Sequence, residues 1–211
     1  MTPALLVIAK EPVPGRVKTR LTPPCTPEQA AAVARAALED TLAAAHAVER
    51  HVRRVLVLDG EPGDWIPTGF EIVRQRGDGL AQRLAAAFED VDGPAFLVGM
   101  DTPQVPPALL EAGLDAVLAG EAAFAAALDG GYWGIGLHEP DARVFDGVPM
   151  SAGNTGAVQL GRLAALGLRT RLLPPLRDID TIEDARAVAL QAPGGRFSAV
   201  LAEVEPEAQA A

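Results

Sequence analysis

Residues 4–20 read ALLVIAKEPVPGRVKTR, an apolar run that passes directly into a proline-rich, cationic loop. A continuous apolar run such as Ala4 to Ala9 is typical of a strand that is buried on both faces of a sheet. The loop carries four basic residues and one acidic residue, with Gly15 at its centre. Gly15 allows a close backbone turn, and the prolines reduce the ordering entropy lost on binding. Such a loop after a buried strand suits a polyanion, although a solvated surface loop is the alternative.

Both lysines of the chain, Lys10 and Lys18, lie in this loop, whereas every other basic residue is an arginine. Lysine is a compact point charge and arginine is a planar fork. The two lysines therefore indicate positions where the planar guanidinium of an arginine does not fit.

The rest of the chain alternates strand-like and helix-like segments. Further strands are predicted at residues 54–58, 71–74, 95–98, 124–128, 132–137 and 170–173. Helices are predicted at residues 26–48, 80–91, 107–118, 155–166 and 181–191, the first opened by a capping box of Thr26 and Gln29. This alternation implies an α/β fold with a parallel or mixed sheet covered on both faces. We expect one domain over residues 1–202 and a disordered acidic tail at 203–211.

Composition narrows the function further. Of 211 residues, 49% are hydrophobic and 22% are charged, which is typical of a globular protein. The net charge of −10 disfavours nucleic-acid binding. We find neither an apolar run of about 20 residues nor a basic segment before the first strand, so membrane spans and a signal peptide are not expected. We expect a cytoplasmic monomer or homodimer in which the single cysteine, Cys25, is a packing residue.

In open sheets of this class, ligands bind beyond the carboxyl ends of the strands. Asp101 follows the strand at 95–98, where one carboxylate and phosphate oxygens can hold a hard cation, or where it caps a turn. Asp178 and Asp180 share one side of an extended segment. Asp180 could complete a metal site with Asp101, or it could cap the next helix with Glu183 at the third helical position.

Two further segments are candidates for the acceptor side of a site. Asp129-Gly130-Gly131 indicates a hairpin, in which paired glycines allow close ligand approach and Tyr132 or Trp133 forms a wall. Residues 151–155 open a helix and could either cap it or hold an anion. The three histidines are too scattered for a metal site.

Taken in order, these motifs resemble the DUF2064 family. Residues 8–21, IAKEPVPGRVKTRL, closely resemble its opening signature, and the motifs at 99–103, 129–132 and 178–181 follow in the family's order. The resemblance spans residues 4 to about 190. It implies a three-layer α/β/α, Rossmann-like GT-A fold with a mixed, mostly parallel sheet. Family members are labelled glycosyltransferase-like and are similar to molybdenum-cofactor guanylyltransferase and 2-phospho-L-lactate guanylyltransferase. Leu128 and the segment 151–155 depart from the family pattern, which leaves the acceptor open.

The resemblance also implies roles for individual residues. The nucleotide phosphates would be held by Lys10, Pro14, Gly15, Arg16, Lys18, Thr19, Arg20 and Gly99. Asp101 and Asp180 would bind Mg²⁺ or Mn²⁺, and Lys18 and Asp101 would be the catalytic pair. The acceptor would be bound by Asp129, Gly130, Gly131, Tyr132, Ser151, Asn154 and Thr155.

The predicted reaction is transfer of a nucleoside monophosphate from a nucleoside triphosphate to a small anionic acceptor, with release of pyrophosphate. An acceptor that is already ionised needs no general base, so positioning and charge stabilisation would suffice. Four positive charges suit a triphosphate better than the diphosphate of a nucleotide sugar. The alternatives are glycosyl transfer from a nucleotide sugar, with Asp129 as base, and a non-catalytic nucleotide-binding domain.

Overall fold

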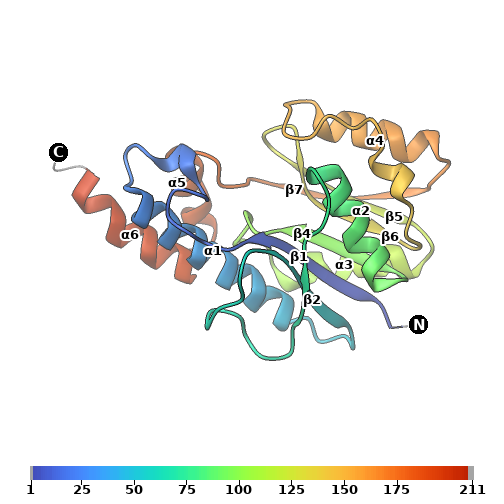
Figure 1. Cartoon of the computed structure of the whole chain (residues 1–211), viewed down its shortest axis with the longest axis horizontal. Helices are drawn as coiled ribbons and strands as arrows, with labels where there is room; N and C mark the ends of the chain where they lie inside the picture. Colours follow the sequence, from blue (N-terminus) through green and yellow to red (C-terminus); the bar gives the residue numbers. More distant parts are fainter. Residues whose placement is uncertain (1, 209–211) are drawn as a thin grey trace.

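The computed structural model describes residues 2–208. The strands of this part of the chain form one seven-stranded sheet (Figure 1). Its strands are β1 (Ala4–Lys10), β2 (Arg53–Asp59), β3 (Glu71–Arg74), β4 (Ala95–Gly99), β5 (Ala122–Ala127), β6 (Tyr132–Leu137) and β7 (Thr170–Leu176). The strand order is β3-β2-β1-β4-β6-β5-β7. β6 is antiparallel to both of its neighbours, and all other pairs are parallel. The predicted mixed, mostly parallel sheet is confirmed.

Helices cover both faces of this sheet (Figure 1). They are α1 (Pro27–His46), α2 (Leu80–Val91), α3 (Pro107–Leu118), α4 (Thr155–Ala165), α5 (Ile182–Gln191) and α6 (Arg196–Ala208), with short 3₁₀ helices η1 (Thr19–Leu21) and η2 (Ala142–Phe145). α1 and α3 pack on one face, whereas α2, η2 and α4 pack on the other. The expected three-layer α/β/α fold is therefore confirmed. Within residues 2–208, the structure has no helix long and apolar enough to cross a bilayer.

β1 shows why its sequence is an unbroken apolar run. Leu5 and Val7 pack in the layer of α1 and α3, while Ala4 and Leu6 pack in the layer of α2. Successive side chains of a strand point to opposite faces, so a central strand between two helical layers needs apolar residues at every position. Because β1 is held between the two helical layers, the position of the cationic loop at its carboxyl end is fixed as well.

α1 begins with the predicted capping box. Thr26 Oγ1 accepts a hydrogen bond from the amide of Gln29 at 3.2 Å, and Gln29 Oε1 accepts one from the amide of Thr26 at 2.8 Å. The helix is buried along two sides, since Leu38 and Leu42 face the sheet while Val33 faces α5 and α6. Its richness in alanine lets neighbouring elements approach on both sides.

α6 was not predicted, and it corrects the expected tail. The helix continues to Ala208, so residues 203–208 are helical rather than disordered, while residues 209–211 lie outside the described part of the chain. Phe197, Leu201 and Val204 are buried against the outer side of α1 and α5. The start of α6 is capped from α1, because Asp40 carboxylate oxygens accept hydrogen bonds from the amides of residues 196 and 197.

Candidate functional site

The sheet brings the four predicted motifs to one edge. β1, β4, β5 and β7 all end there, and because β6 is antiparallel, the turn that enters it lies there too. A cleft of about 950 Å³ opens at this edge. We call it the strand-end cleft.

Most of the predicted site residues line the strand-end cleft. Those that line it are Lys10, Arg16, Lys18, Thr19, Arg20, Gly99, Asp101, Asp129, Gly131, Tyr132, Ser151, Thr155 and Asp180. Four other predicted residues, Pro14, Gly15, Gly130 and Asn154, are described but lie outside its lining. Gly15 and Gly130 instead shape the backbone, with φ angles of 74° and 91°.

The segment between β3 and α2 also lines the cleft, and sequence reasoning missed it. Gln75, Gly79, Leu80 and Arg83 all contribute. Gln75 donates through Nε2 to the carbonyl oxygens of Ala9 (2.8 Å) and residue 57 (3.0 Å), and Arg83 donates to Asp59 Oδ2 at 2.8 Å. These bonds tie the segment to β1 and β2. The sequence did indicate that this segment lines a ligand site, because it directly follows a predicted strand.

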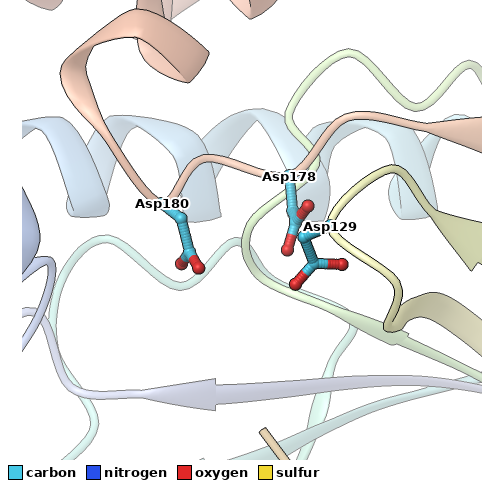
Figure 2. A group of neighbouring side chains, drawn as sticks. All are labelled: Asp129, Asp178 and Asp180. Atoms are coloured by element: carbon cyan, nitrogen blue, oxygen red, sulfur yellow. The ribbon is translucent and has the colours of Figure 1, made fainter. Parts of the chain in front are cut away.

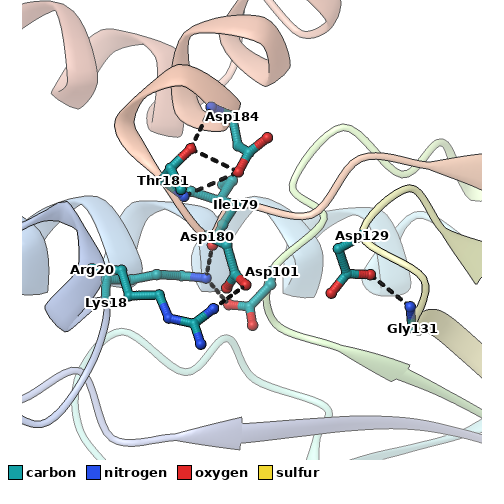
Figure 3. A network of polar contacts seen from close by, with 9 residues as sticks. All are labelled: Lys18, Arg20, Asp101, Asp129, Gly131, Ile179, Asp180, Thr181 and Asp184. Carbon is teal, nitrogen blue, oxygen red and sulfur yellow. Dashed lines mark hydrogen bonds and ion pairs between the residues drawn. The ribbon is translucent and has the colours of Figure 1, made fainter. Parts of the chain in front are cut away.

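Lys18 joins three parts of the chain (Figure 3). Its Nζ lies 2.6 Å from Asp101 Oδ1, beyond β4, and also donates to the carbonyl of Ile179, beyond β7. The Lys18 side chain is only 7% exposed, whereas that of Asp101 is 42% exposed. Lys18 has a left-handed backbone, with φ of 47°. The ammonium is therefore held by the fold at the edge of the cleft.

A second ion pair lies beside it. Arg20 Nη1 donates to Asp180 Oδ2 at 2.8 Å, and both side chains are exposed to solvent (Figure 3). An exposed pair of this kind contributes little to stability. Arg20 and Asp180 are therefore free to exchange partners when a charged ligand enters.

The acidic residues gather differently from the prediction. Asp129, Asp178 and Asp180 each place a carboxylate oxygen within 4.8 Å of the others (Figure 2). Asp180 was expected to pair with Asp101 at a metal, but Asp101 contacts Lys18 and is not one of these three. Both Asp178 and Asp180 line the cleft.

The alternative that Asp180 caps α5 is wrong. Thr181 is the N-cap, and its Oγ1 accepts from the amide of Asp184 at 3.2 Å. Asp184, not Glu183, completes the capping box by accepting from the amide of Thr181 at 3.1 Å. The carboxylate of Asp180 is thus released from helix capping and reaches the cleft.

Asp178 has an unusual protonation equilibrium. Burial raises its pKa to about 6, and the negative charge of Asp129 adds to the shift, followed by smaller contributions from Asp180 and Asp101. Burial and like charges both disfavour the ionised carboxylate. A group of carboxylates with such a shift, inside a cleft, is typical of a functional site.

Asp178→Asn is expected to raise the melting temperature of the metal-free protein, more at pH 7 than at pH 4. In the folded state the pKa is about 6, above the ordinary value of 3.8. The folded protein therefore binds the extra proton, and this stabilisation is lost as the pH rises from about 4 through 6. Thermal unfolding in EDTA at both pH values measures the effect.

The matched control is Asp146→Asn, whose side chain is 69% exposed. We expect it to change the melting temperature little at either pH. If Asp178→Asn changed the melting temperature equally at both pH values, the loss of stability at high pH would not come from ionisation of the Asp178 carboxyl group.

The Asp129–Gly131 turn packs against the loop before α4. The predicted hairpin is confirmed, since β5 and β6 are antiparallel, and Asp129 Oδ1 accepts from the amide of Gly131 at 2.7 Å (Figure 3). The carbonyl of Gly130 accepts from the amide of Gly156 at 2.8 Å. Asn154 makes no side-chain cap to α4. These contacts place Asp129 and the turn beside residues 151–155.

Tyr132, the first residue of β6, is one of the residues that line the cleft. Its hydroxyl lies 3.4 Å from Gln159 Oε1 and 3.9 Å from Met150 Sδ. Burial raises the pKa of Tyr132, so the phenol stays neutral. Trp133 is largely structural, since its indole donates to the carbonyl of Pro174 at 3.1 Å.

Solved structures share this fold at low sequence identity. A "putative nucleotide-diphospho-sugar transferase" from Desulfovibrio desulfuricans G20 is 24% identical, with a TM-score of 0.87, and the match covers 99% of this chain and 98% of that one. CMP:2-keto-3-deoxy-manno-octonic acid synthetase, solved with CTP, is 14% identical, with a TM-score of 0.56 and coverage of 92% and 99%.

A third structure is Rv0371c from Mycobacterium tuberculosis H37Rv, in complex with manganese. It is 22% identical, with a TM-score of 0.52, and the match covers 89% of this chain and 97% of that one. At these identities the likeness establishes a nucleotide-diphospho-sugar transferase-like fold.

Family membership rests on the sequence. None of the curated proteins matches this chain. The model of DUF2064, a family described as uncharacterized proteins conserved in bacteria, matches residues 29–152. That range includes α1 from its third residue on, β4 and the hairpin that carries Asp129. This chain belongs to the DUF2064 family.

Proposed function

We propose that this chain is a metal-dependent nucleotidyltransferase, which moves a nucleoside monophosphate from a nucleoside triphosphate to a small anionic acceptor. The observation that carries the proposal is the arrangement of charge in the strand-end cleft. Lys10 is the last residue of β1, and Arg16, Lys18 and Arg20 follow in the next segment, whereas the carboxylates come from the segments after β4, β5 and β7. A triphosphate and a divalent cation need these two kinds of group side by side.

The loop after β1 supplies the charge that a triphosphate requires. Lys18 is presented from a fixed backbone and is almost fully enclosed. Arg16 and Arg20 line the cleft beside it. A pre-positioned cation stabilises the charge that moves onto the leaving phosphates without reorganising in the transition state.

The transfer itself needs few protein groups. An oxyanion of the acceptor attacks the α-phosphorus in line, a new P–O bond forms, and the bond to the β-phosphate oxygen breaks as pyrophosphate leaves. Positioning by the loop and the hairpin turn would supply much of the rate enhancement. No residue has to remove a proton if the acceptor is a phosphate or a carboxylate.

The carboxylates fit a hard divalent cation. Asp129, Asp178 and Asp180 offer closely spaced oxygens. Burial, and after it the charge of Asp129, raise the pKa of Asp178, and a bound cation would stabilise its ionised form. Asp101 would bind the same cation after its ion pair with Lys18 is broken. A bound Mg²⁺ or Mn²⁺ would neutralise charge on the phosphate oxygens, and the manganese in the Rv0371c structure supports a divalent cation.

Glycosyl transfer from a nucleotide sugar is the second candidate. An alcohol acceptor needs a general base, and a carboxyl group with a pKa of about 6, as in Asp178, is suited to that role near neutral pH. The structure from Desulfovibrio desulfuricans also carries the name of a sugar-nucleotide enzyme.

Thermal-shift measurements with each nucleoside triphosphate, UDP-glucose and GDP-mannose, with and without Mg²⁺ or Mn²⁺, separate these functions. We expect one triphosphate to stabilise the protein only with metal. At 100 times its dissociation constant a ligand adds about 2.7 kcal/mol, or roughly 5–10 °C for a chain of this size. Lys18→Ala and Asp101→Ala should abolish the shift.

The other outcomes are equally informative. A response to a sugar nucleotide alone would favour glycosyl transfer. Tight triphosphate binding that needs no metal, without pyrophosphate release for any acceptor, would favour a non-catalytic nucleotide-binding domain. If none of the nucleotides stabilised the protein, the assignment of the loop to phosphates would be wrong.

A further inference from the structure

The part of the cleft assigned to the acceptor has no positive charge of its own. We call it the β6 wall, meaning Tyr132, Gly134, Met150 and the cleft-lining residues among 151–155. Among the described lining residues, the cations come from the loop after β1 and from Arg83, whose guanidinium is already paired with Asp59. Asp129, in the turn that enters β6, is acidic, and its carboxylate lies within 4.8 Å of those of Asp178 and Asp180. A second heavily charged molecule would therefore find no partner there.

The floor next to the β6 wall is apolar. Leu84 and Leu97 belong to the core layer between the sheet and α2, with Ile8, Tyr132 and Met150 packed against it, and all five line the cleft. Leu80, the first residue of α2, also lines it and is 43% exposed. An exposed leucine above an apolar floor gains free energy when an apolar ligand covers it.

Two polar side chains of the β6 wall, those of Tyr132 and Thr155, are already engaged. The hydroxyl of Tyr132 lies at hydrogen-bonding distance from Gln159 Oε1. Thr155 Oγ1 donates within its own loop and accepts from the amide of Ala152 at 3.0 Å. The β6 wall is therefore suited to recognising shape and apolar surface rather than charge.

We propose that the acceptor presents an apolar or aromatic body to the β6 wall and to the apolar floor beside it, and that it carries one anionic group, the one that attacks the nucleotide. The inference rests on the proposed nucleotidyl transfer and names the class of its acceptor. Amphipathic acids, such as aryl or alkyl monophosphates and carboxylates, satisfy it. Polyhydroxylated sugar phosphates do not.

The test compares two monophosphates of equal charge, phenyl phosphate and glycerol 3-phosphate. Each is titrated by calorimetry into the protein with Mn²⁺ and a non-hydrolysable analogue of the triphosphate that stabilises it. We expect phenyl phosphate to bind at least about tenfold more tightly, since its ring buries apolar area that glycerol lacks. Equal affinities, or a preference for glycerol 3-phosphate, would overturn the proposal.

Leu80→Ser tests whether the preference for phenyl phosphate arises at the apolar floor. The Leu80 side chain is partly exposed, so the variant is expected to fold. We expect phenyl phosphate affinity to fall about fivefold, with binding of the triphosphate analogue unchanged. Leu190→Ser, at an 85% exposed position on α5 outside the cleft, is the matched control and should change neither.

Measuring the triphosphate analogue first keeps the two proposals distinct. If the analogue binds but Leu80→Ser weakens it, the apolar floor holds the nucleobase and the acceptor inference is wrong while nucleotide binding stands. If the analogue does not bind with metal, the proposed function fails and the acceptor inference fails with it.

Discussion

Replacing Lys18 by alanine is expected to lower kcat/KM for nucleotide transfer by about 10²–10³-fold, which corresponds to roughly 3–4 kcal/mol of transition-state stabilisation. The ammonium is enclosed, and its contacts to Asp101 and Ile179 hold it at the edge of the cleft. Pyrophosphate release, measured over a range of nucleotide concentrations, tests the expectation.

The arginine variant shows whether charge alone is sufficient. Lys18→Arg is also expected to lose most of the activity, because a planar fork is larger than the enclosed site of a single ammonium. Lys10→Arg is the matched control, since Lys10 is exposed at the end of β1, and we expect a loss of no more than about threefold. Because Lys10 is exposed, the interpretation that an arginine does not fit is kept for Lys18 alone. Wild-type activity in Lys18→Arg, or an equal loss in both variants, would contradict the assignment of this effect to the enclosed site of Lys18.

Much of the fold could be predicted because its signals are local. β3, α2, α3 and β6 span the predicted residues without change. Their apolar periodicity and their flanking glycines and prolines lie within or beside each segment. α1 was predictable for the same reason, since both halves of its capping box are three residues apart.

Two of the features that sequence reasoning missed depend on distant partners. α6 is capped by Asp40, which precedes Arg196 by 156 residues, and its apolar face is covered by α1. Neither fact is visible in the segment itself. In the site, the strand-end rule correctly gathered Asp101, Asp129 and Asp180 at one cleft. It did not show that Lys18 holds Asp101 while Asp129 approaches Asp180, because that depends on side-chain direction.

Gly130→Ala is expected to lower the free energy of unfolding by about 3 kcal/mol or more, and the melting temperature by roughly 6–12 °C. A β-carbon at Gly130 would lie 2.0 Å from the carbonyl oxygen of Gly153. Both partners are backbone, so the contact is relieved only if the hairpin turn moves away from the loop before α4. The left-handed φ of 91° adds strain for any residue with a side chain.

Gly167→Ala separates these two causes. Gly167 also has a left-handed φ, 73°, but a β-carbon there meets no atom within 4 Å. Its substitution should therefore cost only the backbone term, about 1 kcal/mol. Thermal unfolding of both variants gives the difference, which is the cost of separating the turn from the loop. If the two variants lose the same stability, the close packing of Gly130 against Gly153 contributes nothing, and the Asp129 turn is not held by that loop.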